Sequence, residues 1–163
     1  MTSIKTGDLT CILGKNDVGK STILEALDAF FNENIDKGDL NTDLETGVIE
    51  ITCTFDEIPK KLVLDSSVET SPNDEYILNT NGNLEIKKEF KIGKSISKAT
   101  YIVAHHPTDE KLLRLLSLKN TPLKNLADEI DADLDGVNRS KNPPLRLAIR
   151  EKIESPLETI EIK

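Results

Sequence analysis

Hydrophobic positions change their spacing along the chain, and each change predicts a different kind of element. Residues 9–13 form a short apolar run bounded by Gly14, which predicts a buried strand that is parallel to its neighbours and covered on both faces. After a polar loop, residues 21–31 take helical spacing, with apolar side chains on one face and Glu25 and Asp28 opposite. The polar, glycine-containing stretch 32–46 predicts a loop.

The middle of the chain alternates apolar and polar positions, as strands do. Asn81 and Gly82 both tolerate positive φ, so they predict a hairpin between the strands on either side of them. Pro59 is expected to follow the end of the first of these strands. The predicted strands cover residues 48–55, 62–64, 76–78, 84–86, 90–92 and 99–104.

Helical spacing returns after Asp109 and predicts helices to the end of the chain. A leucine-rich helix is expected over residues 112–118, and a second over residues 123–130. Pro143 and Pro144 open a third, because proline fits the first helical turn. The element order is therefore one strand, one helix, several antiparallel strands and then helices.

Composition limits the class of protein. The chain has 163 residues, 37% hydrophobic and 31% charged, which suits one globular domain. Its net charge of −8 repels phosphates at long range, so bulk charge does not favour nucleic-acid binding. No apolar run reaches the roughly 20 residues of a membrane helix. With Cys11 and Cys53 expected to be free thiols, we predict a cytoplasmic protein.

One motif carries clear chemistry. The run 14–22 satisfies the P-loop pattern G-x-x-x-x-G-K-[ST] between an apolar run and an amphipathic helix. The glycines allow a tight turn that presents backbone N–H groups to phosphates, and the helix start adds its positive end. Lys20 is predicted to reach the β and γ oxygens, and Ser21 to ligate Mg²⁺. The predicted nucleotide-binding residues are Gly14, Lys15, Asn16, Asp17, Val18, Gly19, Lys20, Ser21 and Thr22.

The run 10–31 resembles the P-loop of ABC/SMC-like ATPases. Within that group, GKND-GKS followed by LEALD-FF is most similar to the AAA-type ATPase domain of OLD family ATP-dependent endonucleases. The resemblance implies an α/β P-loop NTPase fold, the N-terminal lobe of such a head, with an antiparallel β subsheet and a helical C-terminal part. It also implies ATP and Mg²⁺ as cofactors, in a protein of DNA processing or phage defence.

The resemblance has consequences for organisation and partners. Residues 1–163 are expected to be a partial ATPase domain, with the P-loop and strands in 1–104 and a mainly helical part in 105–163. A second copy, or the remaining part of the same head, is the expected partner. Nucleic acid is expected to bind only the complete protein, and no membrane is involved.

Several parts of the ATPase pattern are missing. The chain has no glutamine for a Q-loop, no Ser-Gly-Gly signature, and no apolar run ending in Asp-Glu that would be a Walker B strand. The nearest candidates are Phe55-Asp56-Glu57 and Leu64-Asp65. No acidic cluster of the nuclease type is evident. These departures predict an incomplete head that hydrolyses little ATP alone, with no catalytic residue assigned.

Other readings of the P-loop stay open. The chain is alternatively a non-catalytic ATP-binding regulatory or interaction subunit that a partner completes. A small P-loop kinase is a further alternative, with Arg139 and Arg146 as lid arginines, although such kinases continue with parallel strands. A transporter ATPase would need the missing glutamine and signature. Adenine preference follows from the resemblance alone.

Weaker patterns have ordinary interpretations. The run 131–136 resembles half of an EF-hand loop, but the closing position is Asn142 instead of glutamate, which favours a solvated acidic loop. His105 and His106 are adjacent, so on a strand they would face opposite sides, and surface positions are expected. A locally basic region near the last helix predicts a solvated face, or else a nucleic-acid or partner contact; it comprises Arg139, Lys141, Arg146, Arg150 and Lys152.

Overall fold

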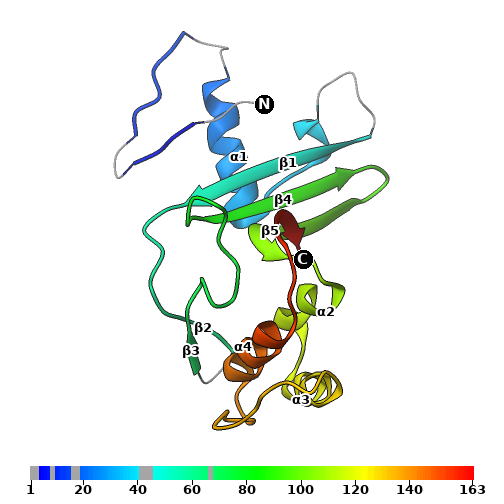
Figure 1. Cartoon of the computed structure of the whole chain (residues 1–163). Helices are drawn as coiled ribbons and strands as arrows, with labels where there is room; N and C mark the ends of the chain where they lie inside the picture. The colour runs from blue at the N-terminus through cyan, green and yellow to red at the C-terminus, as the bar shows by residue number, and fades with distance from the viewer. Residues whose placement is uncertain (1–3, 8–9, 16–18, 41–45, 66–67) are drawn as a thin grey trace.

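The protein has an α/β fold built on a four-stranded antiparallel sheet (Figure 1). The computed structural model describes residues 4–7, 10–15, 19–40, 46–65 and 68–163. The sheet has the order β1-β4-β5-β6, and β2 and β3 form a separate pair. The strands are β1 (Gly47–Phe55), β2 (Leu62–Asp65), β3 (Val68–Thr70), β4 (Leu84–Ile92), β5 (Ile96–Pro107) and β6 (Leu157–Ile162). The helices are α1 (Lys20–Asn32), η1 (Lys37–Asp39), α2 (Glu110–Leu113), η2 (Leu115–Ser117), α3 (Asn120–Glu129) and α4 (Asn142–Lys152).

The two faces of the sheet make different contacts. Ile49 of β1 pairs with Phe90 of β4, and their side chains share the face on which α1 lies. On the opposite face, Lys87 binds Glu50 at 3.2 Å and Glu161 at 2.5 Å. The hydrogen bond to Glu161, together with Glu50, raises the pKa of Lys87. Two ion pairs of Lys87 therefore connect β4 to β1 and to β6 on this face.

Helix α1 confirms the helix expected over residues 21–31, and its aromatic end anchors it to the sheet. Phe30 is buried, and its ring centroid lies 6.2 Å from that of Phe55. Glu33 follows the helix and binds Lys88 at 3.2 Å and Lys98 at 3.3 Å. These hydrogen bonds hold the pKa of Glu33 below its usual range. The helix is thus fixed across β1, β4 and β5 at its C-terminal end.

The C-terminal helices enclose their own apolar core. The predicted second and third helices are confirmed as α3 and α4, with prolines in the first turn of α4. The leucine-rich helix is shorter than predicted and splits into α2 and η2. The core residues are Leu112, Leu115, Leu123, Ala127, Leu145 and Ile149. None of the helices in the described ranges combines the length and the apolar character that a membrane span requires.

The strand predicted at residues 9–13 is wrong over its described part. Residues 10–15 have no regular structure, and the Leu13 side chain is 87% exposed; residue 9 lies outside the described ranges. A buried parallel strand needs hydrogen-bonded neighbours, and the described strands place none beside residues 10–13. The apolar run therefore lacks a sheet to join within the described chain.

The predicted hairpin is also wrong, although its turn is correct. Gly82 has φ 77°, and the Asn79 N–H donates to the Asn83 carbonyl at 2.9 Å, so a tight turn forms. Residues 76–78, however, form no strand: Tyr76 has φ 53°. The Leu78 carbonyl instead accepts from the His105 N–H of β5 at 2.9 Å. Strand β4 pairs with β1 and β5, and the pattern analysis missed β3 and β6.

Candidate functional site

The start of α1 has no side-chain cap among the described residues. Gly19 precedes the helix with φ 81° and ψ 19°, a left-handed conformation that strains any residue with a side chain. Among the described residues, no side chain caps the helix start, and its first turn carries no acidic residue. The first N–H groups of α1 therefore keep their hydrogen-bonding capacity and the positive end of the helix dipole.

Lys20 folds back over the preceding segment. Its ammonium donates to the Gly14 carbonyl at 3.0 Å and also to the Lys15 carbonyl. The first residue of α1 thereby contacts two residues that lie five and six positions before it in the sequence. These contacts hold a positive charge against Gly14 and Lys15, the described residues at the beginning of the loop.

The remaining predicted residues surround this point as far as they are described. Gly14 and Lys15 lie in exposed, non-regular backbone, and Ser21 and Thr22 are exposed in the first turn of α1. Asn16, Asp17 and Val18 lie outside the described residues. Uncapped N–H groups, an ammonium group and two exposed hydroxyls suit a phosphate chain with its metal ion, because the N–H and ammonium groups donate to anions and a hydroxyl oxygen can ligate a metal. Whether nucleotide occupies these nine positions stays a prediction.

Arg146 and Arg150 are not on a solvated face, and that default interpretation is wrong for both. Their side chains are buried around Glu75, which is 1% exposed. Arg146 donates through Nε and Nη2 at 2.8 and 2.5 Å, and Arg150 through Nη1 at 2.9 Å. Thr70 donates to the same carboxylate at 2.9 Å. These two arginines are therefore not available as lid or nucleic-acid contacts.

Burial and charge act in opposite directions on this cluster. Burial raises the pKa of the Glu75 carboxyl, but hydrogen bonds and positive charge from Arg146 and Arg150 outweigh it, so the pKa stays below its usual value. Burial also lowers the pKa of Arg150. Glu75 lies 71 positions from Arg146, so no local spacing could have identified the partner. Arg139, by contrast, is half exposed and pairs with Asp128 at 2.6 Å.

The histidine pair lies on β5, and the expectation of surface positions is wrong for His106. His106 is buried and its Nδ1 donates to the Pro107 carbonyl at 2.7 Å. Burial lowers its pKa, and the nearby Arg150 charge acts in the same direction. Asp109 accepts the Lys111 N–H at 2.8 Å and caps α2. His106 and Asp109 are thus engaged in structural contacts, whereas the buried Nδ1 of His105 has no hydrogen-bond partner in the described part of the chain.

The EF-hand-like run 131–136 makes its own turn contacts. The Asp135 N–H donates to the Asp133 carboxylate at 3.0 Å, and Asp131 has φ 54°. Across the described ranges, no group of three or more His, Cys, Asp or Glu residues is arranged to hold a metal ion. The solvated-loop interpretation fits this geometry.

Comparison with known proteins gives one finding. A family model described as AAA ATPase domain matches residues 2–161. No curated protein and no solved structure gives a significant match to the chain. The matched range includes the glycine-rich loop, the sheet and the C-terminal helices.

Proposed function

Because the chain belongs to the AAA ATPase domain family, we propose that it binds ATP with Mg²⁺ at the loop formed by residues 14–22. The observation that carries the proposal is the Lys20 ammonium, held over the Gly14 and Lys15 carbonyls at the uncapped start of α1. Phosphate oxygens would replace these carbonyls as acceptors for the ammonium. Charge-assisted hydrogen bonds of this kind are about twice as strong as neutral ones.

The described residues fit the metal as well as the nucleotide. Ser21 is exposed in the first turn of α1, one residue after Lys20, so its hydroxyl is the proposed ligand. Mg²⁺ supplies positive charge that offsets repulsion among the phosphate oxygens. Gly19 contributes the left-handed turn that aims the following N–H groups at the anion.

The finer proposal is that the chain is the ATPase portion of an OLD-like ATP-dependent endonuclease. Its support is the LEALDAFF segment, which forms α1 as that resemblance implies, together with the antiparallel sheet beside it. Nuclease and Walker B groups would come from elsewhere in the assembly. Sequencing the coding DNA downstream of Lys163 tests this, because the proposal requires a Walker B strand encoded there or in a neighbouring gene.

Exposed apolar side chains support an incomplete head. Leu13 is 87% exposed, Leu24 is 62% exposed and Phe31 is 60% exposed. Leu24 and Phe31 are seven positions apart and so share one side of α1. We propose that a second copy, or the rest of the same head, covers this side and supplies the groups for hydrolysis. The chain alone is then expected to bind ATP with little turnover.

A non-catalytic regulatory subunit is the second candidate. The same apolar surface favours it, because a partner that covers Leu24 and Phe31 would complete a binding site without requiring chemistry. Hydrolysis measurements on the assembled complex separate the two functions. ATP turnover that rises on assembly supports the ATPase, and binding without turnover at every concentration supports the regulatory subunit.

Titration of the chain with Mg²⁺-ATP and with Mg²⁺-GTP tests the binding proposal. Lys20→Ala is expected to weaken binding by about tenfold or more, because a hydrogen-bonded charge at phosphate is lost. Lys94→Ala, which removes an exposed lysine from the β4–β5 turn, is the matched control and should bind like the parent chain. Equal affinities of the two variants, with both folded by circular dichroism, would contradict the proposal.

A further inference from the structure

Strand β1 forms one edge of the main sheet, and no other strand of the described chain pairs with its outer side. It pairs with β4 over nine residues in continuous register, from Gly47↔Ile92 to Phe55↔Leu84. In the described chain, no backbone hydrogen bond joins β1 to any segment other than β4. The outward N–H and C=O groups of alternate residues therefore have no backbone partner among the described residues.

This edge lacks the features that usually block strand addition. Its sequence, GVIEITCTF, contains no proline and no lysine, and its register shows no bulge. The other open edge, β6, has six residues, and β1 has nine. An open, regular strand of this length can accept a further strand through its main chain.

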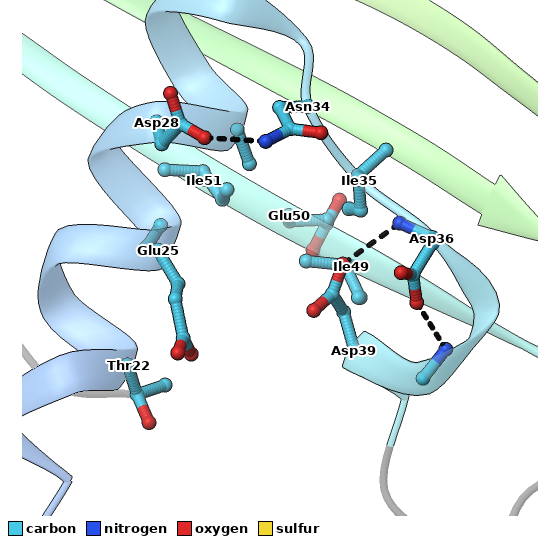
Figure 2. A pocket seen from close by; sticks show the side chains of 13 residues that line it. Thr22, Glu25, Asp28, Asn34, Ile35, Asp36, Asp39, Ile49, Glu50 and Ile51 are labelled. Carbon is cyan, nitrogen blue, oxygen red and sulfur yellow. Dashed lines mark hydrogen bonds between the residues drawn. The ribbon is translucent and has the colours of Figure 1, made fainter.

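A cleft of about 520 Å³ runs along the same edge, between α1, residues 34–39 and β1 (Figure 2). Ile49, Glu50 and Ile51 all line it. Successive strand residues point to opposite faces, so a cleft that touches all three lies at the edge of the strand. Isoleucine and alanine side chains from β1 and α1 supply its apolar surface.

The walls of the cleft are acidic. Five carboxylates line it, and none of the lining residues is lysine or arginine. Among the described residues, Glu25 has no hydrogen-bond or ion-pair partner, whereas Glu50 binds Lys87 on the adjacent strand. Hydrogen bonds from Asn32 and then Asn34 lower the pKa of Asp28, which keeps it charged. The five carboxylates are Glu25, Asp28, Asp36, Asp39 and Glu50.

We propose that this cleft binds an extended segment of a partner protein that carries lysine or arginine and adds to β1 as a fifth strand. Main-chain hydrogen bonds would pair it with β1, and its basic side chains would face Glu25 and Glu50. Figure 2 shows Glu25 of α1 and Asp39 of η1 on opposite sides of the cleft, with β1 between them. The charge selects a basic occupant.

Charge also argues against a second copy of this chain as the occupant of the cleft. A second copy that paired β1 with β1 would bring two such acidic clefts together, and like charges across paired strands are destabilising. Thr22 belongs to both the glycine-rich loop and the cleft wall, so the occupant would lie next to the start of α1. The proposal itself does not depend on nucleotide binding.

The test uses the full chain and a fluorescently labelled heptapeptide, acetyl-Val-Lys-Lys-Val-Lys-Lys-Val-amide, whose lysines point to both faces of an added strand. We expect saturable binding by anisotropy, and slower hydrogen exchange at the amides of β1. The same peptide with glutamate in place of lysine should bind about tenfold more weakly or worse, because its charges meet carboxylates. A version with alternate backbone amides methylated keeps the charges but loses main-chain donors, and should also lose about tenfold or more.

The protein side of the test uses Glu25→Gln with Glu50→Gln. The double variant should bind the lysine peptide about threefold more weakly or worse. Glu158→Gln, an exposed position on β6, is the matched control and should bind normally. Thermal melts establish that each variant is folded.

Four results would overturn the proposal: no binding of the lysine peptide, equal binding of the methylated peptide, no effect of the double variant, or exchange protection outside β1. A concentration-dependent dimer that protects β1 without peptide would identify a second copy as the occupant and would also overturn it.

Discussion

Glu75 is a buried carboxylate that faces two arginines of α4. Arg146 is fully buried and Arg150 nearly so, and both donate to Glu75 through the contacts at 2.5–2.9 Å. The two guanidinium groups therefore share the Glu75 carboxylate in a site with little water. The Arg150 guanidinium also lies 5.5 Å from the centre of the Tyr76 ring, whose electrons favour a cation. This cluster ties residues 70–76 to α4.

Glu75→Gln should therefore strongly destabilise the chain, although it changes only the carboxylate to an amide. It removes the buried carboxylate to which both guanidinium groups donate, which costs about 3 kcal/mol or more in the free energy of unfolding. Urea denaturation measures this loss. Asp128→Asn breaks the exposed pair with Arg139 and should cost less than about 1 kcal/mol. Similar losses in the two variants would show that Glu75 is not held as described.

His106 predicts a pH dependence of stability near neutrality. Its folded-state pKa is lowered from 6.5, mainly by burial, so the unfolded chain binds the proton more readily. The stability that follows from neutral His106 is fully present above pH 6.5 and is lost as pH falls through the lower folded-state pKa. The free energy of unfolding should decrease as the pH is lowered from about 7.5 to about 5.5, the range around the usual histidine pKa.

His106→Asn is the matched variant for that measurement. An asparagine amide can donate to the Pro107 carbonyl as the Nδ1 group does, but it does not titrate. The variant should show a flatter dependence on pH than the parent chain, whatever its absolute stability. Parallel curves for the two proteins would contradict a buried, neutral imidazole.

At the scale of elements, sequence patterns identified what short spacing determines. Helical spacing of apolar residues located α1, α3 and α4, and alternation located β1. In each of these elements, the apolar residues that form the buried side are close together in the sequence. The Asn81-Gly82 turn was also readable, since it depends on local φ. These elements include the helix that begins the candidate site.

Long-range pairing was not readable from the same patterns. Strand β6 is defined by its register with β5, from Ile102↔Ile162 to Pro107↔Leu157, and nothing near β6 specifies that partner. Residues 76–78 resemble a strand, but Tyr76 adopts a positive φ and the segment docks at β5 through Leu78. The apolar run at 10–13 has the pattern of a strand but no regular structure. A strand also needs a hydrogen-bonded neighbour, which the local pattern does not reveal.

The packing of α1 against the sheet predicts that two adjacent phenylalanines contribute differently to the free energy of unfolding. Phe30 is 4% exposed and contacts Phe55, while Phe31 is largely exposed. Phe30→Ala should lower the free energy of unfolding by about 3–5 kcal/mol, the usual cost of removing a buried aromatic ring. Phe31→Ala should lower it by less than about 1 kcal/mol. Denaturant titration of both variants checks this, and a reversed order would mean that α1 packs through its other side.

In the whole molecule, the candidate site lies at the start of α1, and a separate apolar core lies among the C-terminal helices. The core around Leu115 and Leu123 is closed, whereas Leu13, Leu24 and Phe31 near α1 stay exposed. These are the exposed apolar side chains that we propose another protein segment covers. With a net charge of −8, the chain needs local donors such as Lys20 and the α1 N–H groups to hold phosphates.

The most direct test of the account is the amide NMR spectrum of the full chain during titration with Mg²⁺-ATP. The largest shift changes should belong to Gly14, Lys15, Gly19, Lys20, Ser21 and Thr22, because their backbone groups or neighbours would contact the phosphates. Lys20→Ala should suppress these changes, while Lys94→Ala should preserve them. Saturating shifts confined to other residues, or none at all in the folded chain, would contradict ATP binding at this loop.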